Sequence, residues 1–541
     1  MKYPVLHFLM LTCLISSAQS HTISGYIEDA DSKERIIGVN VFLKGTSYGT
    51  TSNTYGFYSL TVPEGEYQLV VSFIGYQNYI DSLSLTADHQ IDINLEATSQ
   101  ELMEVEVTAE ELPAEQAQMS SISLKAADIK KIPALMGEVD VIRAIQLLPG
   151  VQSGSEGTTG FYVRGGSPDQ NLILLDGVPV YNASHLFGFF SVFNADAIKN
   201  VKLTKGGFPA RFGGRLSSVL EIDMKEGNMK EFHGEGSIGL VASKLTLEGP
   251  IVKDKTSFMV SGRRTYIDAL AAPFIASMEG YKAGYWFGDV TAKVNHVFSR
   301  KDRLYLSYYG GKDRFYYREE YEYGQGSRIK EIYDTHLQWG NNTGSLRWNH
   351  LFNDQMFGNL TATFSEYEFS TGYSAQYTDP GPPRQEEGQG FEYISRIRDM
   401  GLRYDMEYQL NAKHSLRFGG NYTYHSFTPG AAQIVERYDD LDVDSLLEFS
   451  EPIYSHDLWA YVEDDFNISK RWRANYGLHY SMYFVESTRY QSLQPRLSLR
   501  YLLRDDWLLK PLTPVWPNTY TFFQILALAY PLTSGCRPLI M

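Results

Sequence analysis

The sequence contains few of the residues on which several classes of protein depend. Only 2 of its 541 residues are cysteine, which excludes a disulfide scaffold and a zinc site built from several cysteines. Lys and Arg number 48 against 64 Asp and Glu, so the net charge is −16. Such an acidic chain lacks the basic surface that a nucleic-acid-binding protein requires. No apolar, charge-free run of about 18 residues follows the first twenty residues, so the body of the chain predicts no transmembrane helix.

Motifs of the common enzymes are missing as well. The sequence has no G-x-S-x-G, H-E-x-x-H or G-K-[ST] pattern, and none of its 12 histidines forms a pair at i, i+4. Residues 234–239 do match G-x-G-x-x-G, but alternation of apolar and polar residues continues after them where a dinucleotide site needs a helix. We therefore predict a glycine-bearing β-strand there, and we expect no enzyme, no cofactor and no metal site.

Aromatic residues and an N-terminal signal are what the chain does have. With 39 Tyr and 46 Gly, the composition favours β-structure with aromatic girdles over a helical enzyme. Lys2 precedes an apolar run over residues 5–15 and small residues at Ala18 and Ser20, which is typical of a secretory signal peptide over residues 1–20. The run is too short for a transmembrane anchor, and Thr12 before Cys13 disfavours a lipoprotein signal.

Residues 21–97 contain five short apolar or alternating runs separated by glycines, which predicts a small β-sandwich. A polar, acidic linker follows over residues 98–125. Inside it, alternation returns over six residues, which indicates an extended segment able to add to the edge of another sheet: Met103, Glu104, Val105, Glu106, Val107 and Thr108. Alternatively, this segment is a strand of a neighbouring domain.

Residues 126–226 combine helix and strand signals. Apolar residues at helical spacing run over residues 126–148, interrupted at Pro133. The pair Asp176-Gly177 between two apolar runs predicts a two-residue hairpin turn with both residues at positive φ. Further strands are expected over residues 197–203 and 219–224.

Period-two alternation dominates residues 227–509. Apolar residues alternate with polar ones in about eleven strand-length segments, which is typical of a transmembrane β-barrel, although a large soluble sandwich alternates too. The expected connections alternate between short and long, which fits periplasmic turns and external loops. The short ones lie at residues 299–302, 353–355, 411–413 and 469–471, and the long acidic loops at 317–335, 373–395 and 428–456.

Several segments resemble one known family. Residues 45–58 (GTSYGTTSNTYGFY) resemble the carboxypeptidase-regulatory-like sandwich that precedes many outer-membrane receptors. Residues 148–151, 161–166, 174–180, 198–207 and 211–222 resemble, in order, the plug domain of TonB-dependent outer-membrane receptors of the Bacteroidetes type. The motif residues are Arg164, Gly165, Gly166, Asp176, Gly177, Gly206, Gly207, Arg211, Gly213, Gly214 and Arg215. Residues 103–108 lie where this family carries its TonB box.

The resemblance implies a mainly β chain: an N-terminal β-sandwich, an α/β plug and the first half of an antiparallel outer-membrane barrel. It implies uptake of a small or oligomeric ligand through the outer membrane of a Gram-negative cell, with the N-terminal domain in the periplasm. Expected partners are the TonB energy-transducing complex and outer-membrane lipid, and a surface lipoprotein stays open. Siderophore, cobalamin, peptide and glycan all stay open as ligands. The alternative is a secreted or outer-membrane binding or sensor protein without transport activity.

The last 32 residues differ from the rest. Residues 510–541 contain no Asp or Glu and five prolines, although the preceding residues carry all 64 acidic side chains. Compatible codons exist whose alternative frame reads like a further barrel strand and loop of the family. We therefore expect an out-of-frame tail after Leu509, and a product that on its own forms no closed, transporting barrel.

Overall fold

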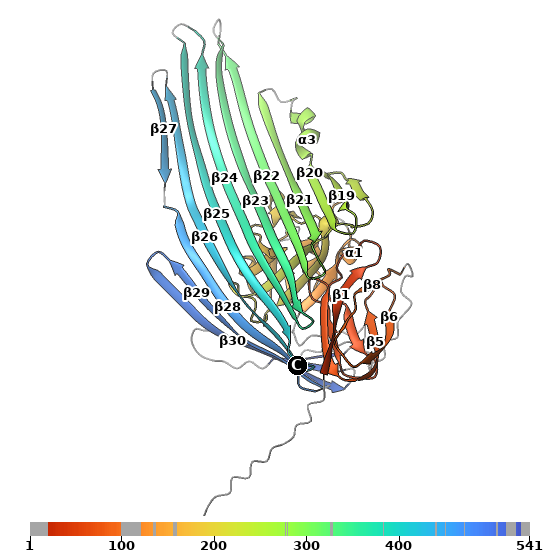
Figure 1. Cartoon of the computed structure of the whole chain (residues 1–541). Coiled ribbons are helices and arrows are strands. Elements are labelled where there is room, and N and C mark those ends of the chain that lie inside the picture. Colours follow the sequence, from red (N-terminus) through yellow and green to blue (C-terminus); the bar gives the residue numbers. More distant parts are fainter. Residues whose placement is uncertain are drawn as a thin grey trace, which may run out of the picture.

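The computed structural model describes residues 20–98, 121–133, 137–154, 159–275, 277, 280–324, 328–381, 384–438, 441–448, 451–469, 471–504, 507–514 and 526–531. The signal peptide expected before Ser20 and the candidate segment 103–108 lie outside these residues. The chain is mainly β, as expected, and it has three parts: a small sandwich, a plug and one long curved sheet (Figure 1). Among the described helices, none has the length and apolar character needed to span a bilayer.

The N-terminal sandwich consists of two sheets, ordered β4-β1-β7, with β8 also beside β1, and β3-β2-β5-β6. Apolar residues from both sheets, such as Ile23, Val41, Leu69 and Leu85, form its core. We expected five strands and the structure has eight. The strands are β1 (Ser20–Asp29), β2 (Asn40–Leu43), β3 (Gly49–Thr51), β4 (Phe57–Pro63), β5 (Gly65–Ser72), β6 (Tyr79–Leu85), β7 (His89–Gln90) and β8 (Ile93–Leu95).

The plug (residues 121–226) is built on the five-stranded sheet β13-β12-β17-β16-β9. Its edge strand β9 lies in what we expected to be linker and pairs with β16. The helical run expected over residues 126–148 is present as two short helices, because Pro133 cannot continue a helix. The elements are β9 (Ser121–Lys125), α1 (Ala126–Ile129), α2 (Val141–Gln146), β10 (Val151–Ser153), β11 (Phe161–Val163), η2 (Pro168–Gln170), β12 (Asn171–Leu175), β13 (Val178–Pro179), β14 (Ser184–His185), η3 (Leu186–Gly188), β15 (Phe190–Ser191), η4 (Ala195–Ala197), β16 (Ile198–Lys205) and β17 (Ser218–Met224).

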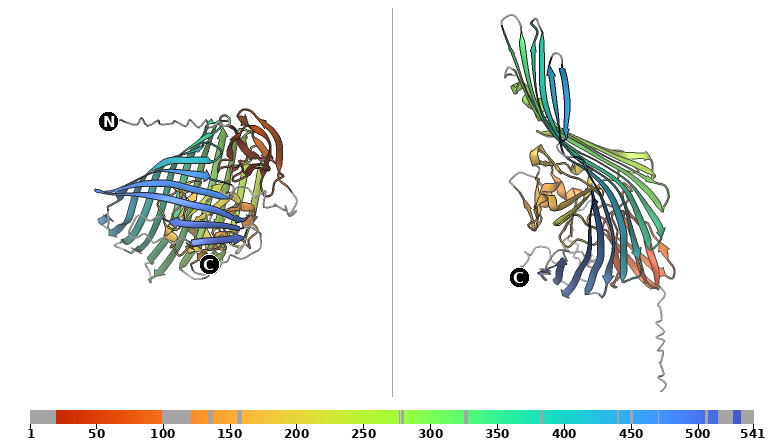
Figure 2. Two further views of the ribbon diagram at one scale, coloured as in Figure 1. Left: turned by 90° about the horizontal axis from the view of Figure 1, so that it is seen from below. Right: turned by 90° about the vertical axis from the view of Figure 1, so that its left-hand side faces the viewer.

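The long sheet runs from β18 to β32 with each strand antiparallel to the next, and among the described strands β27 pairs with β26 alone. It curves around the plug (Figures 1 and 2), and in the described part of the chain its two ends, β18 and β32, do not pair with each other. The strands are β18 (His233–Ile238), β19 (Ala242–Val252), β20 (Thr256–Thr265), β21 (Tyr281–Val297), β22 (Asp302–Tyr323), β23 (Ile329–Asn353), β24 (Met356–Asp379), β25 (Gln385–Gln409), β26 (His414–Tyr438), β27 (Leu441–Glu448), β28 (Ile453–Asn467), β29 (Trp472–Val485), β30 (Thr488–Arg504), β31 (Trp507–Pro514) and β32 (Leu526–Pro531), with helix α3 (Ile267–Ile275) between β20 and β21. Residues 234–239 lie largely in β18, as predicted for a strand.

Our expectation of three long acidic loops in this sheet needs correction. Most of the long acidic segments is strand: β22 to β25 include residues 317–323, 329–335, 373–379 and 385–395 as paired strands, and β26 and β27 occupy most of 428–456. Their charges suggested loops, but tyrosines alternate with those charges and favour strands. Strand structure also continues past residue 509 into β31, whose pairing with β30 lapses at Lys510 and Pro511 because proline has no N–H to donate.

Candidate functional site at the interface of plug and barrel

The turn Asp176-Gly177 joins β12 to β13 and lies against the wall of the barrel. Both residues have positive φ, 47° and 81°, as the predicted hairpin requires. A Cβ atom at Gly177 would lie 3.0 Å from Nη2 of Arg347 on β23, so glycine gives both the turn and the close approach. The same Nη2 donates a hydrogen bond to the carbonyl oxygen of Asp176 at 2.5 Å.

The carboxylate of Asp176 connects the plug to two barrel strands. Its Oδ2 lies 2.8 Å from Nζ of Lys293 on β21 and accepts a hydrogen bond from Ser307 Oγ on β22 at 2.6 Å. Its Oδ1 accepts the N–H of Met224 at 2.9 Å, and the residue is 1% exposed. Burial alone would raise the pKa of Asp176, but the charges of Lys293 and Arg347 outweigh burial and hold this pKa below its usual value. Asp176 is therefore an ionised, fully partnered anchor.

A second anchor is His185 in β14. Its Nδ1 lies 2.5 Å from Oδ2 of Asp313, its Nε2 lies 3.2 Å from Oδ2 of Asp289, and its ring stacks on Phe287 with centroids 4.3 Å apart. Burial would lower the pKa of His185, but Asp313 and Asp289 reverse this effect and raise it. The imidazolium form is thus favoured between two barrel carboxylates.

The loop after His185 has an unusual backbone. Leu186 and Phe187 have φ of 49° and 54°, a region that costs a residue with a side chain roughly 1 kcal/mol or more. The N–H of Leu186 donates to Oδ1 of Asp313 at 2.9 Å and to the Tyr285 hydroxyl at 2.7 Å, so barrel contacts hold the strained turn in place. Phe187 is 58% exposed, with ring centroids 5.1 Å from Trp339 and 5.8 Å from Tyr285.

Our sequence interpretation did not single out this loop. The available signal was weak: a histidine followed by an apolar run (HLFGFF), which is ordinary for a buried hairpin. The partners Asp289 and Asp313 lie more than one hundred positions away in the sequence, so no local pattern links them to the histidine.

A third anchor contains Arg211 and Gly213 of the plug motif. Nη1 of Arg211 lies 2.5 Å from Oε1 of Glu463 on β28, a side chain that is 1% exposed. His479 on β29 donates from Nδ1 to the carbonyl oxygen of Ala210 at 2.7 Å. A Cβ atom at Gly213 would come within 2.6 Å of Nε2 of this histidine, so the site has no room for a side chain.

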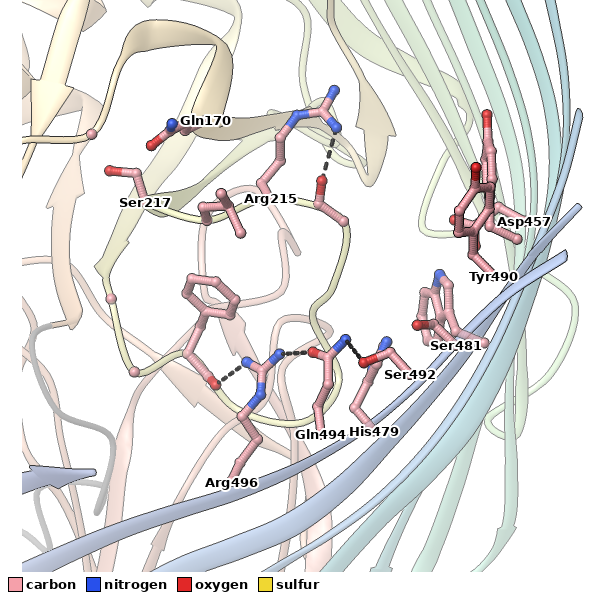
Figure 3. A pocket seen from close by; sticks show the side chains of 18 of the residues that line it. Gln170, Arg215, Ser217, Asp457, His479, Ser481, Tyr490, Ser492, Gln494 and Arg496 are labelled. Atoms are coloured by element: carbon pink, nitrogen blue, oxygen red, sulfur yellow. Dashed lines mark hydrogen bonds between the residues drawn. The ribbon is translucent and has the colours of Figure 1, made fainter. Parts of the chain in front are cut away.

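A cavity of about 1470 Å³ lies between the plug and the inner faces of β28, β29 and β30 (Figure 3). Its barrel side mixes polar residues, such as Asp457, His479 and Gln494, with apolar and aromatic ones, such as Phe427 and Trp459. Arg496 donates to the carbonyl oxygen of Phe208 and to Gln494, each at 2.8 Å, which connects a plug loop to β30. The plug side is lined by seven of the predicted motif residues: Arg164, Gly165, Gly166, Gly206, Gly207, Gly214 and Arg215.

The structure thus brings the predicted plug motif together in two ways. Asp176, Gly177, Arg211 and Gly213 contact the barrel, and the other seven residues line the cavity. Among the described residues no group of His, Cys, Asp and Glu is arranged to hold a metal ion.

The N-terminal sandwich contacts the barrel at its short turns. Ser24 Oγ donates to Oδ1 of Asp354 at 2.9 Å, and Ser59 Oγ donates to the carbonyl oxygen of the same residue at 2.8 Å. Glu34 of the sandwich lies 3.6 Å from Nζ of Lys199 in the plug. In Figure 1 the sandwich accordingly lies beside the plug at the end opposite the long strand extensions.

Three family models match the chain in this order. A CarboxypepD_reg-like domain matches residues 23–108, a TonB-dependent receptor plug domain residues 113–218, and a TonB-dependent receptor-like β-barrel residues 279–510. Together these matches cover more than three quarters of the chain.

Curated relatives and a solved structure agree with the models. TonB-dependent receptor P3 of Formosa agariphila is 27% identical over 192 residues, covering 33% of this chain and 18% of the relative. TonB-dependent receptor SusC of Bacteroides thetaiotaomicron is 29% identical over 227 residues, covering 39% and 21%. The matches thus span about a fifth of each relative. The pyoverdine-bound receptor FpvA of Pseudomonas aeruginosa has the same fold, with a TM-score of 0.50 and 14% identity over 77% of this chain and 61% of that one. The chain therefore belongs to the TonB-dependent receptor family, whose members are outer-membrane receptors and transporters rather than enzymes.

Proposed function

We propose that this chain is the ligand-binding and energy-coupling part of a TonB-dependent receptor for uptake through the outer membrane. The observation that carries the proposal is the plug itself. Charged anchors at Asp176, His185 and Arg211 fasten it to the barrel wall, while its remaining motif residues line a cavity of mixed polar and apolar character. These polar contacts join separate elements, so they can break while the hydrogen-bonded ladders of the barrel sheet stay intact.

The connections of the sheet support one orientation in the membrane. The short turns, with the sandwich beside them, face the periplasm, and the long extensions of β22 to β26 face the outside. The cavity reaches Tyr483 and Tyr490 near the β29–β30 turn, on the same side as those extensions. A ligand arriving from outside therefore meets the cavity before it meets the sandwich.

Energy enters through residues 103–108, the candidate TonB box. An extended segment with Met103, Val105 and Val107 on one face can add to a sheet edge of TonB through main-chain hydrogen bonds. The TonB complex and outer-membrane lipid are then the expected partners, and a surface lipoprotein is a further candidate that nothing in this chain specifies.

Binding to the periplasmic domain of TonB tests this proposal directly. Val105→Pro removes one main-chain donor, and we expect it to abolish co-purification of the detergent-solubilised chain with that domain. Glu104→Gln keeps the main chain intact and is the matched control. If Val105→Pro binds as well as the unchanged chain, the coupling segment lies elsewhere.

We further propose that residues 510–541 are an out-of-frame tail and that this product binds ligand without transporting it. The supporting observations are the missing acidic residues of the tail, the β-barrel match to residues 279–510, and the absence of pairing between β18 and β32 among the described strands. Each unpaired edge group costs several kcal/mol in hydrocarbon, so an open sheet is a poor transmembrane wall. Sequencing of the gene tests the idea: it fails if the alternative frame downstream encodes no barrel strands.

A further inference from the structure

The ends of β22 to β25 extend beyond the plug, as Figures 1 and 2 show, and their two faces differ in chemistry. In each pair of neighbouring strands from β21 to β25, odd-numbered residues lie opposite odd-numbered residues over these extensions, and even-numbered residues lie opposite even-numbered ones. Residues that contact the plug, such as Asp313, Arg347 and Ser365, are odd-numbered. Odd positions therefore face the inside of the barrel and even positions the outside.

The inner face of the extensions is aromatic and acidic. We name it the tyrosine face, and it comprises Tyr281, Tyr317, Glu319, Tyr321, Tyr323, Glu331, Tyr333, Tyr373, Tyr377 and Phe391. At the described odd positions of 315–323, 329–339, 367–379 and 385–397 there is no Lys, Arg or His.

The cations of the same segments lie on the outer face, where carboxylates partner them. Lys330 lies 2.5 Å from Glu320, and Arg398 lies 2.6 Å from Glu366. Arg396 also pairs with an even-numbered glutamate. The two faces of one sheet therefore separate the charges: ion pairs lie outside, and the acids inside have no Lys, Arg or His beside them at the described odd positions.

The inner carboxylates are held in place by tyrosine hydroxyls. Glu319 accepts from Tyr317 at 2.5 Å and from Tyr321 at 3.2 Å, and Glu331 accepts from Tyr333 at 3.1 Å. Glu319 is diagonal to Glu331 across the β22–β23 ladder, so two like charges lie close together. Each carboxylate still has acceptor capacity, and a ligand cation between them would relieve their repulsion.

Aromatic rings that contact one another lie around these carboxylates. The ring centroids of Tyr321 and Tyr333 are 6.2 Å apart, and those of Tyr333 and Tyr373 are 6.5 Å apart. Tyr321 and Tyr373 are exposed, at 42% and 43%. Trp339 lies further along β23, also at an odd-numbered position, and contacts the exposed plug residue Phe187. Glu331 and Trp339 are eight positions apart, or about 26 Å along a strand.

We propose that the tyrosine face binds a short, extended basic peptide, one carrying several Lys or Arg side chains. The carboxylates complement its cations, the rings accept cations over their faces and stack on the aliphatic stems, and the 26 Å length suits a peptide of about eight residues. The face leads to Phe187 at the plug. This assignment rests on the proposed receptor function, because it names the ligand class for the external side of that receptor.

Fluorescence anisotropy with the detergent-solubilised chain tests the assignment without TonB or transport. The probes are labelled octapeptides in which alanine alternates with Lys, Gln or Glu. We expect the Lys peptide to bind at least tenfold more tightly than the Gln peptide, the Glu peptide not to bind, and added salt to weaken binding. Equal binding of the Lys and Gln peptides would overturn the proposal. So would displacement of the Lys peptide by spermine at equal charge concentration, because charge alone would then suffice.

Variants on the two faces supply the matched controls. Glu331→Gln and Tyr333→Ala should each weaken binding of the Lys peptide about tenfold, whereas Glu322→Gln and Tyr316→Ala on the outer face should leave it unchanged. Equal effects from both faces would overturn the proposal. If Val105→Pro loses TonB binding but still binds the Lys peptide normally, the peptide proposal stays intact. The proposal on TonB coupling and the proposal on the tyrosine face can therefore fail separately.

Discussion

Replacing Asp176 by asparagine should loosen the plug without disturbing its turn. Asparagine has nearly the same size and, like aspartate, tolerates the positive φ of 47° at this position, so the backbone need not change. What the substitution removes is the negative charge. Lys293 then keeps its ammonium group in a site where it is 5% exposed and has lost its ion-pair partner at 2.8 Å.

The size of the effect follows from that unpaired charge. Breaking a buried ion pair on one side costs about 3–5 kcal/mol, and asparagine still accepts one hydrogen bond, so we expect about 3 kcal/mol. The double variant with Lys293→Met removes both charges and should recover about 2 kcal/mol of this loss. Because the pKa of Asp176 is lowered in the folded chain, its contribution is fully present above the unfolded pKa of about 3.9 and disappears as the pH falls through the lower folded value.

Hydrogen exchange of the plug strands in detergent measures this loss. At 3 kcal/mol, peptides covering β12 and β17 should exchange about 100-fold faster in Asp176→Asn at pH 7. Asp169→Asn, an exposed carboxylate in the same domain, is the control and should change exchange less than threefold. Acceleration below threefold in Asp176→Asn, or a double variant no better than the single one, would refute the idea that this pair anchors the plug.

Two further predictions concern neighbouring residues. Burial, with the carboxylates of Asp176 and Glu221, raises the pKa of Asp223 to about 6, so its ionisation destabilises the fold as the pH rises from about 4 to 6. Asp223→Asn should therefore stabilise the plug by about 1–2 kcal/mol at pH 7.5 and leave its stability unchanged at pH 4. Equal hydrogen-exchange rates in the variant and the parent at pH 7.5 would contradict this prediction. Gly213→Ala places a methyl group 2.6 Å from Nε2 of His479 and should speed plug exchange at least tenfold. In a chain that already carries His479→Ala, Gly213→Ala should change the exchange rate of the plug little, because the ring it clashes with is gone. If the two substitutions instead speed exchange by fully additive amounts, the clash is ruled out.

Local chemistry explains why part of the site could be predicted. The turn Asp176-Gly177 was predictable because both positions need positive φ, and alternation over 227–509 was enough for a curved antiparallel sheet. Charge misled us about residues 317–335 and 373–395, because acidic residues in an alternating pattern occupy strand faces as readily as loops.

The rest of the site depends on contacts between residues far apart in the chain. His185 acquires its role only from Asp289 and Asp313, and Arg211 only from Glu463, each more than one hundred positions away. Sequence periodicity determines which face of a strand a residue occupies, but not which residue of another domain lies opposite. The motif residues were therefore identified by resemblance, and their division into anchors and cavity lining needed the structure.

The proposed coupling segment, residues 103–108, precedes the first described strand of the plug, β9, so a pull on it would act on the plug through that strand. The chain enters the plug sheet at Ser121, the first residue of β9, whose partner on β16 is Thr204. Tension on the N-terminal side therefore begins at the 121–204 end of an antiparallel edge pair and breaks its hydrogen bonds one after another, at about 1 kcal/mol each. Thr204 is two residues from Gly206 in the cavity lining, whereas Asp176 lies beyond β17. We therefore expect a pull to change the cavity before it releases the buried anchors. A disulfide between Ser121→Cys and Thr204→Cys should block the change in the cavity that a pull by TonB causes, while preserving ligand binding. An unchanged response in the oxidised form would place the point of release elsewhere.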